Sequence, residues 1–199
     1  VLGNAVASEL TPGILTPVPK AGGGSAITGS VEFDGTGDYL SLNQSNDFDF
    51  GTGDFTIELW VHFNLFNSGV DDIIMAGTAN DQWGFYVDDN AGNRLSFVSQ
   101  NNAAAALSGA NAISTGSWNH LAVTRKGTTL YGFVNGILTG TSSGFNYSLS
   151  NNGLGIGAQI NGDNAINGFI SNLRIIKGTA LYTDDFIPPT RELKKVPGT

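Results

Sequence analysis

From about residue 27 onward, apolar and polar residues alternate in short runs with the two-residue period of β-strands. The clearest run is residues 54–63, DFTIELWVHF. One face of it carries Phe55, Ile57, Leu59, Val61 and Phe63, and the other carries Thr56, Glu58, Trp60 and His62. Similar runs occur at 30–35, 39–43, 84–89, 94–100, 118–125, 129–136, 153–158, 168–178 and 180–186. We therefore expect roughly ten to thirteen strands, which is too many for one flat sheet and indicates two packed sheets.

Turn signals separate these runs. Asn135-Gly136 lies between apolar residues, and this dipeptide suits a two-residue hairpin turn in which both positions have positive φ. An Asn/Gly-rich loop at 90–93 is expected to join its two flanking runs as another hairpin. Residues 101–114 are rich in alanine, but they carry no charge and are interrupted by Gly109. A strand followed by a loop is therefore predicted there instead of a helix.

The two histidines, His62 and His120, both fall inside predicted strands. His120 shares a strand face with Trp118, so we expect it to pack beside that ring in a structural role. A metal site shared by the two histidines would need further ligands that the sequence does not show.

Residues 1–26 differ from the rest of the chain and are predicted to form an extended N-terminal arm. They contain three of the six prolines and a Gly-Gly-Gly triplet at 22–24. The arm also carries four large apolar residues, Leu10, Ile14, Leu15 and Val18. Two interpretations stay open, a disordered leader or an arm that docks on a neighbouring subunit. One β-sandwich domain is expected over residues 27–193, followed by a short tail at 194–199.

The composition narrows the function classes. The net charge is −8, which disfavours binding to a phosphate backbone, so no nucleic-acid partner is expected. The chain has no cysteine, and this excludes disulfides, thiolate zinc sites and cysteine nucleophiles. No apolar run approaches the roughly 18 residues of a membrane span, so no membrane insertion is expected.

Four segments together resemble a known family: SVEFDGTGDYLSL, GDFTIELWVHF, GSWNHLAVTRKGTTLYGFVNG and INGFISNLRIIKGTALYTDDFIPPTREL. In order and spacing they are similar to the laminin G-like domains of the concanavalin A-like lectin/glucanase superfamily. The resemblance covers about residues 28–193, and its last segment is similar to versions in phage virion proteins and secreted bacterial proteins. It implies an all-β fold, a two-sheet antiparallel jelly-roll sandwich. This fold hosts enzymes, lectins and structural modules, so it does not by itself imply one function.

The glutamates argue against catalysis. Glucanases of this superfamily place alternating Glu and Asp on one strand face, because nucleophile and acid/base must lie a short distance apart. This chain has four glutamates, at positions 9, 32, 58 and 192, and none lies in such a pattern. No nucleophile elbow, zinc-protease motif or phosphate loop is present either. We expect a non-enzymatic protein.

Sugar sites usually combine an aromatic platform with Asn and Asp side chains, and calcium frequently assists. Loops at 79–83, 145–147 and 161–164 have this composition, and they provide the candidate ligand-binding residues Asn80, Trp83, Tyr147, Asn161 and Asn164. Asp81 and Asp163 are the candidate metal ligands, and Ca²⁺ is the cofactor that they would hold. A structural calcium ion in the loop at 34–38 is an alternative. Asn, Asp and Gly are also common in plain turns, and Trp83 could belong to the core, so that interpretation stays open.

Two functions remain open. The first is a virion decoration or tail-associated protein whose arm contacts other virion or surface subunits and whose lectin-like domain contacts host glycans. The second is a secreted or cell-surface carbohydrate-binding module. Both place the protein on a virion surface or outside a cell, with a glycan as the expected ligand.

Overall fold

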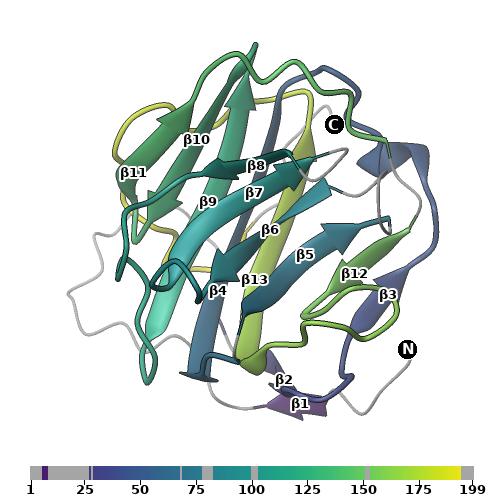
Figure 1. Cartoon of the computed structure of the whole chain (residues 1–199), viewed down its shortest axis with the longest axis vertical. Helices are drawn as coiled ribbons and strands as arrows, with labels where there is room; N and C mark the ends of the chain where they lie inside the picture. Colours follow the sequence, from purple (N-terminus) through teal and green to yellow (C-terminus); the bar gives the residue numbers. More distant parts are fainter. Residues whose placement is uncertain are drawn as a thin grey trace.

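The computed structural model describes residues 6–8, 27, 29–67, 69–77, 83–99, 103–150 and 153–193. These residues form two antiparallel sheets that stack face to face, with the six-stranded sheet in front of the seven-stranded sheet in Figure 1. The larger sheet has the order β1 (Val6–Ser8), β2 (Ser30–Asp34), β13 (Asn167–Lys177), β4 (Phe55–Leu65), β9 (Trp118–Lys126), β10 (Thr129–Val134), β11 (Ile137–Ser142). The smaller has the order β3 (Leu40–Leu42), β12 (Leu154–Ile156), β5 (Val70–Ala76), β6 (Trp83–Asp88), β7 (Arg94–Ser99), β8 (Ala103–Ala106). The predicted all-β sandwich is confirmed, and one short 3₁₀ helix, η1 (Asn46–Phe48), is the only helix in the described part of the chain.

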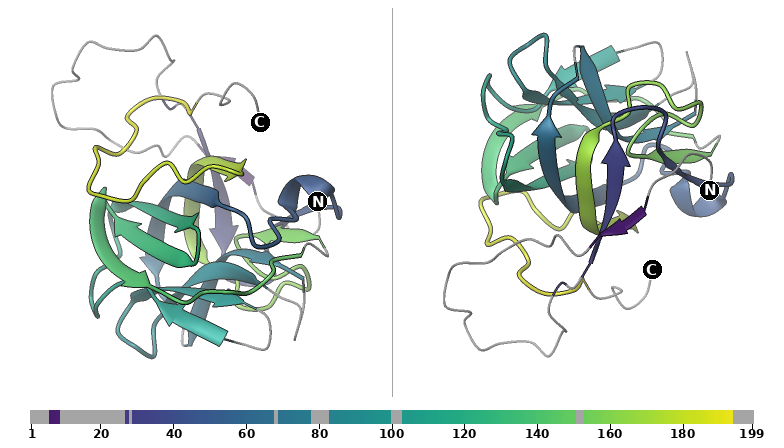
Figure 2. Two further views of the ribbon diagram at one scale, coloured as in Figure 1. Left: turned by 90° about the horizontal axis from the view of Figure 1, so that it is seen from above. Right: turned by 90° about the horizontal axis from the view of Figure 1, so that it is seen from below.

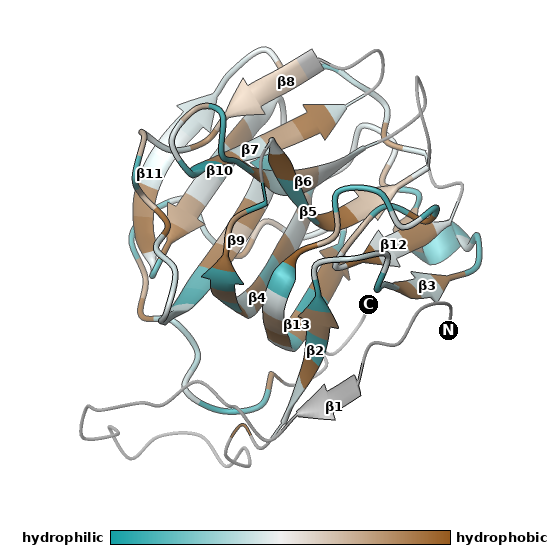
Figure 3. Cartoon of the chain, turned by 60° about the horizontal axis from the view of Figure 1, so that its bottom comes forward, coloured by the Kyte–Doolittle hydropathy of each residue, from teal (hydrophilic) through white to brown (hydrophobic). Residues whose placement is uncertain are grey.

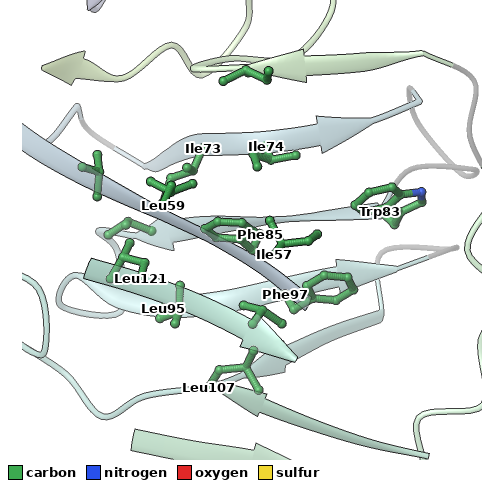
Figure 4. Close-up of a cluster of buried hydrophobic side chains, with 14 of the residues drawn as sticks. Ile57, Leu59, Ile73, Ile74, Trp83, Phe85, Leu95, Phe97, Leu107 and Leu121 are labelled. Carbon is green, nitrogen blue, oxygen red and sulfur yellow. The ribbon is translucent and has the colours of Figure 1, made fainter. Parts of the chain in front are cut away.

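The core lies between the two sheets and follows the predicted alternation. All five apolar residues of β4 that were predicted to share a face are fully buried. Figure 4 shows Ile57 and Leu59 of β4 facing Ile74, Phe85 and Phe97 of the smaller sheet. The same alternation gives β2 its successive hydrophobic and hydrophilic bands in Figure 3. Burial of this apolar surface is the main contribution that holds the two sheets together.

The predicted hairpins are also confirmed. β6 pairs with β7, and β9 pairs with β10. Asn135 and Gly136 join β10 to β11 with φ values of 52° and 80°, as the two-residue turn requires. The alanine-rich segment forms strand β8 and then a loop, as expected.

The ends of the chain are described only in part. Residues 6–8, inside the predicted arm, form β1 and pair with β2 at the edge of the protein's own larger sheet. The rest of the arm and the predicted tail at 194–199 lie outside the described residues. Among the described residues, no helix has the length and apolar character needed to cross a membrane.

The prediction of a closing strand at 180–186 is wrong. Residues 178–193, which we call the C-terminal strap, run as an irregular extended segment over the outer face of the seven-stranded sheet. Figure 2 shows the strap in yellow on the side away from the smaller sheet. The indole Nε1 of Trp60 donates to the carbonyl of Pro189 at 3.0 Å, and Thr56 Oγ1 donates to the carbonyl of Thr179 at 2.9 Å. The polar face of β4 therefore packs against the strap, which satisfies these groups without a ladder of strand hydrogen bonds.

Candidate functional site

The structure places Trp83 in the core, so its predicted role as a sugar-stacking platform is wrong. Its side chain is 0 % exposed, and its ring packs against Phe50 and Phe97. The indole Nε1 donates to the carbonyl of Ser150 at 2.9 Å, which satisfies its only polar group. Trp83 opens strand β6, and strand alternation turns its ring inward, as it does for Phe85.

Tyr147 is displayed at the surface, as a ligand-contacting aromatic should be. It is 39 % exposed, and its ring lies edge-on to the ring of Phe145 at 5.2 Å. The buried guanidinium of Arg125 positions this segment by donating to the carbonyls of Phe145 and Tyr147 at 3.0 and 2.9 Å. Tyr147 and Asn164 do not belong to one site in the structure. Asn164 lines a surface hollow, described below, and Tyr147 does not.

Asn161, Asp163 and Asn164 lie together in the loop at 157–166, between β12 and β13. The amide of Asn161 donates to Asp163 Oδ2 at 2.7 Å, and Asn164 has a positive φ of 55°. The backbone nitrogen of Asp72 donates to the carbonyl of Asn164 at 3.0 Å and holds the loop against β5. Asn80 and Asp81 lie outside the described residues.

The loop forms one wall of a hollow of about 250 Å³ on the outer face of the six-stranded sheet. Its lining residues come from the loop and from strands β5 to β8: Val70, Asp72, Met75, Tyr86, Val98, Ala104, Gln159 and Asn164. We call it the Asp72 hollow. Of the predicted site residues that the structure describes, only Asn164 lines it.

An irregularity in β5 builds the floor of the Asp72 hollow. Residues 72 and 75 are three apart, so a regular strand would point them to opposite faces. The register shifts between Asp72 and Ile74, and both side chains can then face outward while Ile73 and Ile74 face the core. Gly84 lies opposite Met75, and a Cβ there would meet the Ile74 carbonyl oxygen and the Met75 sulfur. Glycine at this position therefore leaves room for Met75 on the floor.

The polar wall of the hollow centres on the carboxylate of Asp72, which is 2 % exposed. Its Oδ2 accepts from Gln159 Nε2 at 2.9 Å and from Asn164 Nδ2 at 2.8 Å. Burial raises the pKa of Asp72, the two amide donors lower it, and the nearby charge of Asp163 raises it. The pKa lies above its ordinary value overall, because two neutral donors offset burial only in part.

Sequence reasoning missed Asp72 and Gln159. The available signal was the pair Asp71-Asp72 at the start of an apolar run, VDDIIMA, where a buried strand would not normally hold two carboxylates. Tyr86 was also missed as a site residue. It is half-buried on the wall of the hollow. Its pKa is raised, mainly by burial and then by the negative charge of Asp88.

A second buried carboxylate, Glu58, lies on the opposite side of the sandwich under the C-terminal strap. It is 0 % exposed, and Arg174 donates to its Oε1 through Nε at 2.8 Å and also through Nη2. Tyr182 of the strap donates to Oε2 at 3.1 Å, and His120 Nε2 lies 3.3 Å from the same oxygen. Burial raises the pKa of Glu58, but the contacts with His120 and Arg174 lower it more, so the net shift is downward.

The aromatic rings of the strap close this cluster. Phe186 stacks on Tyr182 with centroids 3.6 Å apart and meets the edge of His120 at 5.6 Å. His120 lies in a strand as predicted, but its ring contacts differ from the expected packing against Trp118. The His120 ring contacts Trp60 and Phe186, and it is His62 that contacts Trp118. Within the described ranges, no three His, Asp or Glu side chains are placed to hold a metal ion together. The Glu58 cluster joins the strap to the larger sheet through the hydrogen bond of Tyr182 and the ring contacts of Phe186.

Three solved structures illustrate the fold similarity. Domain 4 of AbnA, an extracellular arabinanase of Geobacillus stearothermophilus in complex with arabinotriose, matches with a TM-score of 0.63 at 16% identity, over 89% of this chain and 77% of that one. A heptameric pentraxin of Limulus polyphemus matches with a TM-score of 0.56 at 17% identity, over 73% and 74%. The CBM40 of a Ruminococcus gnavus sialidase, bound to α2,3-sialyllactose, matches with a TM-score of 0.53 at 13% identity, over 74% and 95%.

Sequence comparison supplies the family. A search of curated proteins found no match. A family model described as the concanavalin A-like lectin/glucanases superfamily matches residues 34–184, which is most of the chain and nearly the whole described sandwich. The chain belongs to the concanavalin A-like lectin/glucanase superfamily.

Proposed function

We propose that this chain is a non-enzymatic carbohydrate-binding module that binds its ligand in the Asp72 hollow. The observation that carries the proposal is the position of Asp72. Its buried carboxylate is held by two neutral amides, beside an apolar floor, in a depression open to solvent. Ligand sites in proteins typically combine an apolar lining with a few converging polar groups of this kind.

The residues that line the hollow suit both the apolar C–H face and the hydroxyl groups of a sugar ring. Met75, Val98 and Ala104 offer an apolar surface for the C–H face of the ring. Asp72 can accept hydrogen bonds from sugar hydroxyls, and a charge-assisted bond of this type is stronger than a neutral one. Gln159 and Asn164 carry both donor and acceptor atoms for further hydroxyls. The arabinanase domain and the sialidase CBM40 named above, which have oligosaccharides in their structures, support this class of ligand.

The carboxylates support binding without hydrolysis. Glycoside hydrolases use two carboxyl groups about 5 to 9.5 Å apart on either side of the scissile bond. Asp72 is the single acidic residue among the described residues that line the hollow. Glu58 is enclosed beneath the C-terminal strap on the far side of the sandwich and so cannot serve as the second carboxyl group.

Calcium at Asp163 remains a proposal linked to the same loop. The side chains of Asp72, Gln159, Asp163 and Asn164 all carry oxygen atoms, the ligands that Ca²⁺ prefers. In the structure both amides present their NH₂ groups to Asp72, so a cation there would require both amides to turn. Titration with CaCl₂ followed by calorimetry, with Asp163→Asn as the matched variant, tests this. Saturable heat that the variant abolishes supports calcium, and no heat in either protein excludes it.

A glycan array followed by titration calorimetry tests the sugar proposal. We expect saturable binding that Asp72→Asn weakens by about tenfold or more, because a charge-assisted acceptor is lost. Asp47→Asn, at an exposed carboxylate on η1, is the matched control and should bind like the wild type. Tyr147→Ala tests whether the separate Tyr147 surface contributes. Undiminished binding by a folded Asp72→Asn variant would move the site away from the hollow.

The second candidate function is a virion or cell-surface subunit. Its support is the resemblance of the C-terminal segment to versions in phage virion proteins and secreted bacterial proteins, together with the location of β1 at the edge of the larger sheet. It predicts a symmetric assembly through the arm. Light scattering of the full chain and of a chain lacking residues 1–26 tests it. A monomer in both cases, at all concentrations, contradicts this role. Both candidates place the protein outside a cell or on a virion surface.

A further inference from the structure

The charges around the Asp72 hollow have one sign. Asp72 lies on its wall, and Asp163 is close enough to raise the pKa of Asp72. At the other end of the wall, the charges of Asp88 and Asp72 raise the pKa of Tyr86. Carboxylates at both ends therefore act on the lining groups.

Positive charge does not balance these carboxylates. The described side chains that line the hollow include no lysine and no arginine. Arg94, on β7 beside the hollow, also acts on Tyr86 and lowers its pKa, as the smallest of its influences. Its guanidinium donates to Asp88 Oδ2 at 3.3 Å and is therefore paired with an acid at the rim. By contrast, the other outer face has Arg174 directly on its carboxylate.

From this distribution we infer that the hollow selects uncharged, hydroxyl-rich sugars and rejects sugars that carry a carboxylate, such as sialic and uronic acids. The inference rests on the proposed function, because it assigns a ligand class to the same site. A ligand carboxylate in the hollow would face the buried Asp72 with no cation to pair with, and like-charge contacts across an interface are a strong source of discrimination. A neutral sugar meets the same group with hydroxyl donors.

The test uses matched glycans with and without an acidic sugar. An array presents neutral oligosaccharides and the same oligosaccharides capped with sialic or glucuronic acid at the residue that binds, and affinities are then measured by calorimetry. We expect the neutral member of a pair to bind at least about tenfold more tightly. The ratio should fall as salt is raised, because screening weakens the repulsion at the rim.

A charge variant sharpens the test. Asp163→Asn should raise the relative affinity for the capped glycan several-fold, whereas Asp47→Asn, with the same charge change at a distant exposed site, should leave the ratio unchanged. Capped glycans that bind as tightly as neutral ones would overturn the selectivity and leave glycan binding intact. Absence of any glycan binding by the folded protein would overturn the proposed function and the inference with it.

Discussion

The two outer faces of this sandwich each hold a buried carboxylate, and the partners of that carboxylate differ. Glu58 on the seven-stranded sheet contacts a guanidinium, an imidazole and a phenol, and the C-terminal strap covers it. Asp72 on the six-stranded sheet has two neutral amides as partners and lies at an open hollow. The first face is closed by its own chain, and the second is open to a ligand.

Under the proposed function, this difference separates a structural carboxylate, Glu58, from a ligand-binding carboxylate, Asp72. A buried charge is tolerated when a counter-charge and hydrogen bonds compensate it, and Glu58 is compensated from three directions. Asp72 is held by two neutral amides, and burial raises its pKa. Under the proposed function, its carboxylate accepts further hydrogen bonds from a ligand. Burial alone would not distinguish them, because both side chains are almost fully buried.

The largest expected effect comes from removing the counter-charge of Glu58. Arg174→Met should destabilise the fold by about 3–5 kcal/mol, because it removes the guanidinium counter-charge from a buried carboxylate. Arg94→Met removes the partly exposed pair with Asp88 and should cost less than about 1 kcal/mol. Urea denaturation at neutral pH measures both. Equal small losses would mean that Glu58 does not depend on Arg174.

The next effect concerns Asp71, the neighbour of Asp72 that faces inward and has an unpartnered Oδ2. Burial raises its pKa to about 7 from 3.8. Between these values the folded protein holds a proton that the unfolded chain releases, so the contribution of Asp71 to stability falls as pH rises from about 4 to 7. From about pH 5 to pH 8, wild type should lose roughly 2–3 kcal/mol relative to Asp71→Asn. Parallel pH profiles of the two proteins would contradict this.

A smaller effect is expected in binding. The raised pKa of Asp72 means that its carboxylate is protonated at milder acidity than an ordinary aspartate. Because the protonated form is a weaker acceptor, glycan affinity should fall by about tenfold or more as pH is lowered through that pKa. The residual affinity of Asp72→Asn should change little over the same range. Calorimetry across mildly acidic pH, with the fold checked by circular dichroism, measures this; a flat wild-type profile would argue against Asp72 as the acceptor.

The smallest expected effect is on the strap. Tyr182→Phe removes one donor to Glu58 and should cost about 1 kcal/mol, while glycan affinity stays at the wild-type value. Denaturation and calorimetry on the same preparation test both halves of the prediction. A change in glycan affinity would show that the two faces are coupled, and the contrast between them would then have to be revised.

Much of the fold could be predicted because strand alternation is a local property. Residues 55–63 alternate, and the apolar set is buried as expected, since one face of a packed sheet has to leave water. The Asn135-Gly136 turn could be predicted equally well, because few other dipeptides accept two positive φ values. The absence of a strand at 180–186 could not be predicted, since an apolar-polar run also suits a strap that packs its side chains without pairing its backbone.

The candidate site was predicted less well. Asn164 was identified from loop composition, and it does line the hollow. Trp83 has the same kind of polar neighbours in sequence but points into the core, because loop composition does not determine which face a strand's first residue takes. Asp72 was missed, because its position in the wall of the hollow depends on a register shift in β5 that no local pattern reveals.

The sequence by itself therefore determined the two-layer β architecture, the core face of each long strand and the tight hairpin turns. These follow from the two-residue period of side chains and from backbone conformations that only certain residues adopt. Only the tertiary structure decided which carboxylate lies under the strap and which lines a hollow. That outcome depends on which distant segment packs over each sheet: residues 178–193 bring Tyr182 and Phe186 over Glu58, whereas the loop at 157–166 brings Asn164 and Gln159 beside Asp72 and stops at its edge.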